Sequence, residues 1–185
     1  MEEPLVRLAT ALDLAAIESI YDHYVHNSTC TFQLESEPFS AREAWFSSHD
    51  ERHPVTVATL SRREGDALDG RSGGEVVVGW ASISVYNSRC GYASTVENSV
   101  YVRAGQHGRG IGRALLTDCI ARAEAIGHHT IIAGVGAEQT PSLALHESLG
   151  FVRVALLREV GFKFGRWLDV VYLQKMLGAK QEGSR

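Results

Sequence analysis

The chain has 185 residues, 44% of them hydrophobic, with a formal net charge of −4. This length and composition fit one folded domain that buries about two-thirds of its unfolded surface. The slight acidity argues against a nucleic-acid partner, which needs clustered Lys and Arg. No apolar run approaches the roughly 20 residues of a membrane span, and the acidic N-terminus lacks a signal-peptide pattern. The three cysteines form no Cys-x-x-Cys pair, so we expect a cytoplasmic protein without disulfides.

The first half of the chain predicts two helices and three strands. Residues 6–10 form a short strand, and Asp13 caps a helix over residues 14–25. Ser40 and Glu43 have capping-box spacing and open a second helix. Residues 55–60 and 76–85 predict two strands of a hairpin. The Gly-, Asp- and Arg-rich segment 62–74 between them predicts an exposed, disordered loop.

The second half alternates between strands and helices. Residues 95–102 predict a strand, and apolar residues at every fourth position predict a helix over 110–126. A buried strand follows at 130–135. Thr140 as N-cap and Pro141 at the first helical position then open a short helix. Two closing strands at 152–157 and 168–174 flank a Gly-rich loop, and residues 178–185 form a polar tail. This alternation predicts a single α/β domain over residues 1–177.

A glycine-rich turn separates the strand at 95–102 from the helix that follows. Gly108, Gly110 and Gly112 alternate along it, and glycines allow a ligand to approach the backbone closely. The unpaired N–H groups and positive dipole of a helix start favour an anion such as a pyrophosphate. Arg109 and Arg113 would add positive charge. The alternative is a glycine-rich connection that binds nothing.

Two common nucleotide motifs do not fit this turn. A Rossmann fingerprint that starts at Gly108 requires glycine at position 113, where the chain has Arg113. A P-loop that starts at Gly105 requires lysine after Gly110, where the chain has Ile111.

The turn instead resembles the pyrophosphate loop of the GNAT acetyltransferases, Gln/Arg-x-x-Gly-x-Gly/Ala, with His107 in place of Gln or Arg. Three further stretches are similar to motifs of the phosphinothricin acetyltransferase subfamily: TVENSVYV at 95–102, PSLALHESLGF at 141–151 and GFKFGRWLDV at 161–170. Tyr24 and the segment STCTF at 28–32 resemble a fourth motif in the same order. The resemblance covers about residues 5–177, with 62–74 as an insertion.

The resemblance implies the GNAT fold, a mixed and mostly antiparallel sheet flanked by helices. It also implies a V-shaped opening between the strands at Val100 and Thr130, in which acetyl-CoA lies and pairs with backbone groups. The residues expected to bind acetyl-CoA by this resemblance are Val100, Tyr101, Val102, His107, Gly108, Arg109, Gly110, Ile111, Gly112, Arg113, Gln139 and Ser142. For Gln139, a polar loop residue without a ligand is the alternative. Relatives pair as homodimers, so we expect the same here.

Two residues are candidates for catalysis. Glu97 stands where the subfamily has its base, and strand alternation puts it on one side with Ser99 and Tyr101. The alternative is a surface carboxylate, although Glu is disfavoured within strands. His146 occupies the slot in which many GNAT enzymes have a tyrosine, and could protonate the leaving thiolate. The alternative for His146 is a core or capping histidine.

The acceptor site rests on resemblance as well. Arg89 and Tyr92 match substrate-side positions, and Arg89 could clamp a carboxylate. The alternative for Arg89 is a solvated side chain. Phe32, Lys163 and Trp167 would shape the pocket, with structural packing as the alternative for Trp167. His49 and His53 have helical spacing without a third ligand, so we expect no metal.

The predicted activity is direct acetyl transfer from acetyl-CoA to the amine of a small amino-acid-like molecule, such as phosphinothricin, methionine sulfoximine or methionine sulfone. Two alternatives stay open. One is acetylation of another amine, such as a polyamine, an aminoglycoside or a protein N-terminus. The other is a non-catalytic acyl-CoA-binding module.

Overall fold

The computed structural model describes residues 2–61 and 74–178, which form one seven-stranded sheet and four α-helices. The predicted loop at 62–74 (apart from Gly74) and the predicted tail after Gly178 lie outside the described residues. No helix in the described ranges is long and apolar enough to cross a membrane. Within the same ranges, no group of three or more His, Cys, Asp or Glu side chains is arranged to hold a metal ion.

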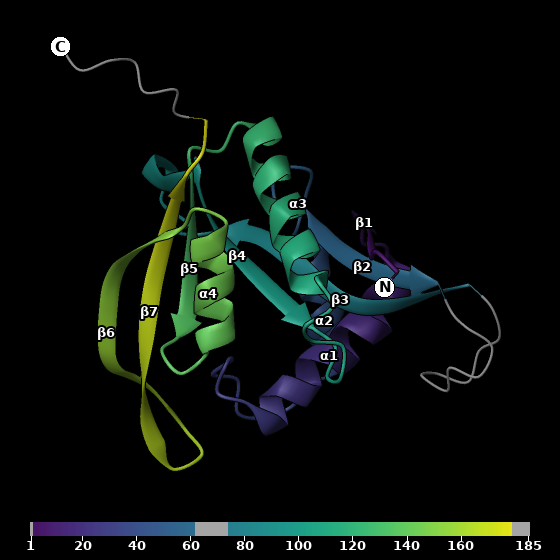
Figure 1. The fold of residues 1–185 in the computed structure, drawn as a ribbon, viewed down its shortest axis with the longest axis horizontal. Coiled ribbons are helices and arrows are strands. Elements are labelled where there is room, and N and C mark those ends of the chain that lie inside the picture. The colour runs from purple at the N-terminus through teal and green to yellow at the C-terminus, as the bar shows by residue number, and fades with distance from the viewer. Residues whose placement is uncertain (1, 62–73, 179–185) are drawn as a thin grey trace.

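The sheet has the strand order β1-β2-β3-β4-β5-β7-β6 (Figure 1). Its members are β1 (Leu5–Leu8), β2 (Val55–Ser61), β3 (Glu75–Val85), β4 (Thr95–Val102), β5 (Thr130–Gly136), β6 (Val152–Lys163) and β7 (Arg166–Met176). Every neighbouring pair is antiparallel except β4 and β5. The expected mixed and mostly antiparallel sheet is therefore confirmed.

Helices cover both faces of the sheet. On one face, α1 (Leu14–Asn27) and α2 (Phe39–Ser47) pack over a cluster formed by Leu14, Ile17, Ile20, Val55, Val57, Val77 and Trp80. On the other face, α3 (Ile111–Ile126) lies over β3 and β4, and α4 (Thr140–Ser148) lies beside β5 (Figure 1). The buried side of α3 repeats at every fourth residue, as predicted: Ile111, Leu115, Cys119 and Ala123 are each at most 1% exposed.

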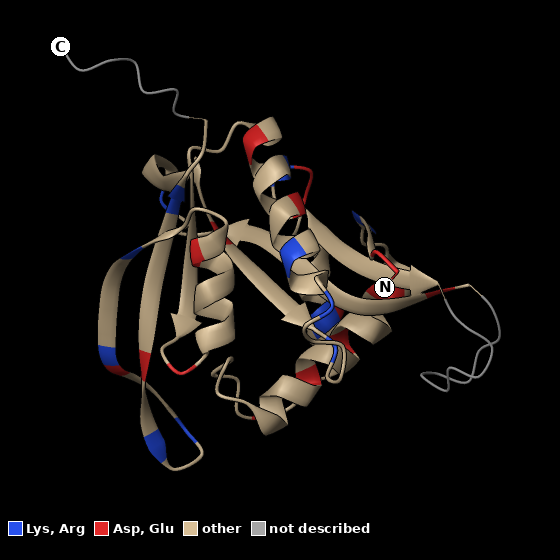
Figure 2. Ribbon diagram, in the orientation of Figure 1, with Lys and Arg blue, Asp and Glu red and all other residues tan. Residues whose placement is uncertain are grey.

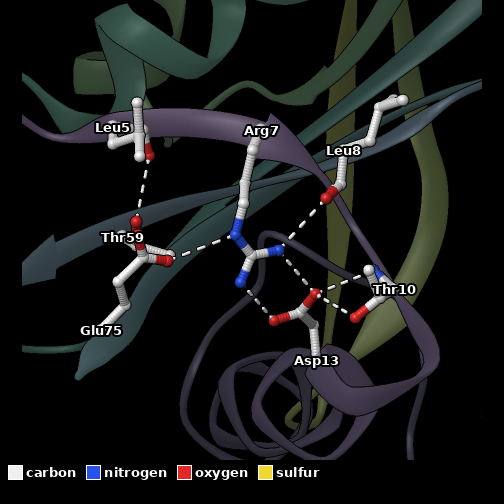
Figure 3. Close-up of polar contacts among 7 residues, drawn as sticks. All are labelled: Leu5, Arg7, Leu8, Thr10, Asp13, Thr59 and Glu75. Atoms are coloured by element: carbon white, nitrogen blue, oxygen red, sulfur yellow. Dashed lines mark hydrogen bonds and ion pairs between the residues drawn. The ribbon is translucent and has the colours of Figure 1, made fainter. Parts of the chain in front are cut away.

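The start of the first helix is organised differently from the prediction. A 3-10 turn (Ala11–Asp13) precedes α1, and the Asp13 carboxylate accepts hydrogen bonds from Arg7 and from the Thr10 backbone N–H (Figure 3). Burial alone would raise the pKa of the Asp13 carboxyl, but these hydrogen bonds outweigh it and the pKa is lowered. Asp13 is the N-cap residue of α1, as predicted, but its side chain makes no capping hydrogen bond to that helix and instead joins β1 to α1 as an ion-pair partner.

The two remaining predicted caps are wrong. Helix α2 begins at Phe39 with Pro38 as its N-cap and has no side-chain cap bond, so Ser40 and Glu43 form no capping box. Because proline fixes φ near −65°, the chain can enter the helix without a polar cap. In α4 the N-cap is Gln139, and Thr140 is the first helical residue.

The hairpin of β6 and β7 is longer than predicted. Its strands run to Lys163 and from Arg166, so the expected Gly-rich loop is only the two residues Phe164 and Gly165. Both have positive φ, 51° and 75°, as a two-residue hairpin turn of the mirror-image type requires. Gly161, which the sequence placed in the loop, pairs with Leu168 inside the ladder.

Candidate active site

Strands β4 and β5 separate after a short parallel contact. Their ladder joins only Thr95–Glu97 to Thr130–Ile132, while β4 continues along β3 as far as Val102 and β5 continues along β7 as far as Gly136. A cavity of about 650 Å³ opens beyond the last pair. The expected opening between the strands at Val100 and Thr130 is thus present.

Backbone polar groups face this opening from both strands. The N–H of Arg103 bonds to β3 and the N–H of Ala137 bonds to β7. Because successive residues of a strand turn their backbone groups to opposite sides, those of Asn98, Val100 and Val102 point into the opening. Those of Gly134 on β5 do the same, whereas the carbonyl oxygen of Gly136 accepts from the Gln139 N–H. Unpaired strand edges of this kind favour an extended ligand that supplies the missing hydrogen bonds.

One end of the cavity is the glycine turn before α3. Gly108 and Gly110 have φ of 75° and 81°, and a side chain on either would meet nothing within 4 Å, so a ligand can approach both closely. Gly110 is the N-cap of α3, so the N–H groups of Ile111, Gly112 and Arg113 have no acceptor within the helix. Basic positions gather at this helix start (Figure 2). The geometry is that of an anion site.

Tyr24 of α1 holds the glycine turn in place through its hydroxyl group. Its hydroxyl group contacts both the carbonyl oxygen of Val102 and Nε2 of His107, the latter at 2.7 Å. A carbonyl can only accept, so the Tyr24 hydrogen goes to Val102 and His107 donates its Nε2–H to the Tyr24 oxygen. Burial, with a smaller contribution from Cys30, raises the pKa of Tyr24 to about 12, which keeps this hydroxyl protonated. His107 is therefore fixed by a residue from a distant helix.

Glu97 stands at the last β4–β5 pair, opposite Ile132. Its side chain lies on the α1 face of the sheet, since its neighbours in alternation include Tyr101, which packs with the α1 cluster. Oε1 is 3.4 Å from the point where a side chain on Gly134 would begin. The carboxylate forms no hydrogen bond with any described residue, and burial raises the pKa of Glu97. A desolvated carboxylate of this kind is a better proton acceptor than a surface one.

His146 of α4 is 3% exposed and lines the cavity from the opposite face. Nδ1 lies 2.8 Å from the carbonyl oxygen of Ser142, and Nε2 lies 3.1 Å from Nδ2 of Asn98. Because the Ser142 carbonyl needs a donor, Nδ1 carries the hydrogen and Nε2 accepts from the Asn98 amide. Burial lowers the pKa of His146. In this neutral form the ring holds no proton on the nitrogen that faces Asn98.

Most of the residues predicted to bind acetyl-CoA meet around the cavity. Those that line it are Val100, Tyr101, Val102, His107, Gly108, Gly110, Ile111, Gly112, Arg113, Gln139 and Ser142. Arg109 does not line it and instead donates to Gln106, which does. Gln139 donates its amide to Thr29 at 3.1 Å, so its side chain also joins α4 to the loop after α1.

None of the predicted acceptor residues lines this cavity. Arg89 is exposed, and the Tyr92 ring packs edge-on against Tyr86 at 5.8 Å. Trp167 is 60% exposed and contacts Phe162 of the neighbouring strand.

Lys163 has a different position from the others. It is 2% exposed, and its Nζ donates to the carbonyl oxygens of Thr31 and Tyr24 at 2.8 and 3.4 Å. It thereby joins the β6–β7 hairpin to the loop after α1. Next to it, a side chain on Gly161 would lie 2.6 Å from the Phe32 ring, so this ring packs directly on the strand backbone. The geometry thus gives Lys163 a structural role between the hairpin and this loop.

Among the residues of the site that were not predicted, Tyr24, Asn98, Gly134 and Tyr172 matter most for its geometry. The sequence did indicate Asn98, because strand alternation places this polar residue on the same apolar face as Val96, Val100 and Val102. No local pattern indicated Gly134 and Tyr172, because they approach Glu97 only through the pairing of β5 with β4 and β7.

Comparisons with known proteins define the class of this fold and site. The Acetyltransferase (GNAT) family matches residues 17–151, so the chain belongs to that family. The L-methionine sulfoximine/L-methionine sulfone acetyltransferase of Salmonella typhimurium is 36% identical over 93% of this chain and 94% of its own. The phosphinothricin N-acetyltransferase of Alcaligenes faecalis is 38% identical over 94% of this chain and 83% of its own. The structure of a phosphinothricin acetyltransferase from Sinorhizobium meliloti in complex with AcCoA superposes with a TM-score of 0.84, at 34% identity, over 98% of this chain and 92% of that one.

Proposed function

We propose that the protein transfers the acetyl group of acetyl-CoA to the amino group of a small amino-acid-like molecule. The observation that carries the proposal is the geometry at the end of the β4–β5 ladder. There, a desolvated carboxylate on one face of the sheet lies beside a cavity that leads to an anion-binding helix start. The names of the relatives support the amino-acid class of acceptor.

The cavity fits acetyl-CoA in its chemistry. The diphosphate would bind the N–H groups at the start of α3 and the open backbone at Gly108 and Gly110. Arg113, which also bonds to Ser148 at 2.9 Å, adds positive charge there. The amide-containing arm would pair with the backbone groups of Val100 and Gly134 that face the opening, with Gln139 and Ser142 beside it.

Glu97 would act as the base. An amino acid carries a protonated amine at neutral pH and must lose a proton before nitrogen can attack. The Glu97 carboxylate takes one proton from the ammonium group, directly or through a water molecule. Acetyl-CoA supplies an activated thioester: the new N–C bond forms as the C–S bond breaks, and its electron pair leaves with sulfur. The second nitrogen proton ends on this thiolate or in solvent, and the backbone N–H groups of Val100 and Val102 stabilise the charge that develops on oxygen.

For His146 the hydrogen bonds favour a positioning role over the predicted general acid. Proton donation from Nε2 would require the Asn98 amide to rotate and the ring to be charged, and burial opposes the charged form. A coenzyme A thiolate, with a parent pKa near 8.5 for a free thiol, leaves without an obligatory acid. His146→Gln would then lower kcat less than Glu97→Gln does.

The acceptor would bind on the α1 face, where Glu97 lies. Arg89 and Tyr92 would contact its carboxylate end, with Phe32 as an apolar wall and Lys163 as its support. Trp167, which alternates with Val171 and Leu173 on the other face, would pack against Phe162 and shape the hairpin without touching the acceptor. The aromatic rings here suit the apolar part of an amino-acid side chain.

We further propose that the protein works as a homodimer in the cytoplasm. Strand β6 is the edge of the sheet, and its apolar side chains Val154, Leu156, Val160 and Phe162 are each about half exposed (51%, 49%, 51% and 51%) (Figure 1). A long, apolar edge strand normally finds a partner. Analytical ultracentrifugation of the wild type and of Leu156→Lys tests this, with a dimer expected only for the wild type.

The test of function is a thiol-release assay with acetyl-CoA over a panel of amino acids, polyamines, aminoglycosides and peptides. We expect turnover with amino-acid acceptors, and for Glu97→Gln a kcat lowered about 100- to 10,000-fold with acetyl-CoA binding retained. Turnover confined to peptides or aminoglycosides would refute the acceptor class. Absence of turnover with every amine, with acetyl-CoA still bound, would indicate a non-catalytic module.

A further inference from the structure

A recess over Gly134 brings together two side chains from different strands. The point where a side chain on Gly134 would begin lies 3.4 Å from Oε1 of Glu97 and 3.7 and 3.8 Å from two ring carbons of Tyr172. Tyr172 pairs with Gly134 across β7 and β5, so both project on the same face of the sheet, as Glu97 does. The lack of a side chain on Gly134 therefore leaves a space bordered by a carboxylate and a phenol.

Both polar groups at this recess lack a partner. Neither the Glu97 carboxylate nor the Tyr172 hydroxyl forms a hydrogen bond with another residue in ranges 2–61 and 74–178, although both side chains are partly buried. Burial, together with the nearby Glu97 and Tyr86, raises the pKa of Tyr172, so the phenol is neutral when Glu97 is ionised. Polar groups that are half-buried and unpaired require a ligand or water.

The chemistry of the recess suits a primary amine. A carboxylate accepts hydrogen bonds only, and a neutral phenol oxygen can accept one more. An ammonium group has N–H donors for both, and its positive charge is favoured beside the aromatic ring of Tyr172. Gly134 also lines the cavity, so an amine in the recess would lie next to the opening between β4 and β5.

We propose that Tyr172 positions the acceptor amine: its hydroxyl oxygen accepts a hydrogen bond from the amino group while Glu97 holds the other side. This inference rests on the proposed role of Glu97 as the base. When the ammonium gives one proton to the Glu97 carboxylate, a neutral amine and a carboxylic acid result. The remaining N–H bonded to Tyr172 fixes the rotation of the amine, which directs its lone pair toward the opening.

A comparison of two ligands on two proteins tests the proposal. Wild type and Tyr172→Phe are titrated calorimetrically with L-methionine sulfone and with the same molecule lacking its amino group, methylsulfonylbutanoic acid. We expect Tyr172→Phe to weaken methionine sulfone binding about 10-fold, because a hydrogen bond to a charged group is lost. Binding of the deaminated acid should stay within about twofold, since it never reached the hydroxyl. The KM for acetyl-CoA should be unchanged.

Equal weakening of both ligands, or of neither, overturns the proposal, because Tyr172 would then not recognise the amine. A merely structural role of the ring predicts equal weakening. Failure of the proposed function has a different signature: wild type would then release no thiol with methionine sulfone or any other amino acid of the panel. If a different amino acid is the better acceptor, that amino acid and its deaminated analogue replace the pair.

Discussion

Gly134→Ala places one methyl group in the recess between Glu97 and Tyr172. The new carbon would lie 3.4 Å from Oε1 of Glu97 and 3.7 Å from the nearest Tyr172 ring carbon, which is ordinary contact without a clash. The φ of Gly134 is not positive, so alanine fits the strand without strain. The substitution therefore removes the space and leaves the fold.

Gly134→Ala should change both the free energy of unfolding and kcat/KM for the acceptor. Alanine restricts the unfolded chain, so the free energy of unfolding should rise by about 0.4–1 kcal/mol, or roughly 1–4 °C in Tm. An amine that must sit about 1 Å farther from the opening loses near-attack geometry, which lowers kcat/KM for the acceptor about 100-fold. The KM for acetyl-CoA should stay unchanged, because the methyl group points along the α1 face and the backbone groups of Gly134 remain free.

Thermal unfolding and steady-state kinetics of the two proteins measure both effects. A stable variant whose acceptor kcat/KM stays within about threefold of wild type would refute the placement of the amine over Gly134. A variant with lowered Tm would refute the prediction that a methyl group fits there without a clash.

Three further outcomes follow from other contacts. Gly79→Ala should lower the free energy of unfolding by about 1–3 kcal/mol, because its new carbon would lie 2.9 Å from the backbone oxygen of Tyr101 and 3.0 Å from Leu115. Thermal unfolding measures this, and an unchanged Tm would contradict it. Tyr24→Phe should raise the KM for acetyl-CoA about 3- to 10-fold, since the hydroxyl that holds the turn is lost, whereas the control Tyr21→Phe, whose hydroxyl bonds to Thr31, should not. Glu97→Gln should raise Tm at pH 7. Because the pKa of Glu97 is raised in the folded protein, ionisation of this carboxyl group destabilises the fold, and glutamine does not ionise. The gain in Tm should vanish below about pH 4.5, the ordinary pKa of a glutamate, where the carboxyl group is protonated in both the folded and the unfolded chain. A gain that persists in acid would exclude this cause.

The sequence predicted the strands and the main helices because their apolar periodicity is local. The face of α3 at Ile111 and Leu115 and the core side of β4 at Val96 both follow from spacing alone. Helix caps were less predictable: Ser40 and Thr140 have capping chemistry, but the N-caps are Pro38, two residues earlier, and Gln139, one residue earlier. Local preference cannot decide between neighbouring starts when packing fixes the helix axis.

The sequence by itself determined the glycine turn, the helix start behind it and the strand that carries Glu97, because each lies within one short segment. Only the tertiary structure decided what surrounds them. Tyr24 reaches His107 across 83 positions, Asn98 reaches His146 across 48, and Tyr172 reaches the Glu97 recess through two strand pairings. The physical reason is that partners so far apart in sequence meet through sheet register and the packing of helices on its faces, which no local pattern of residues records.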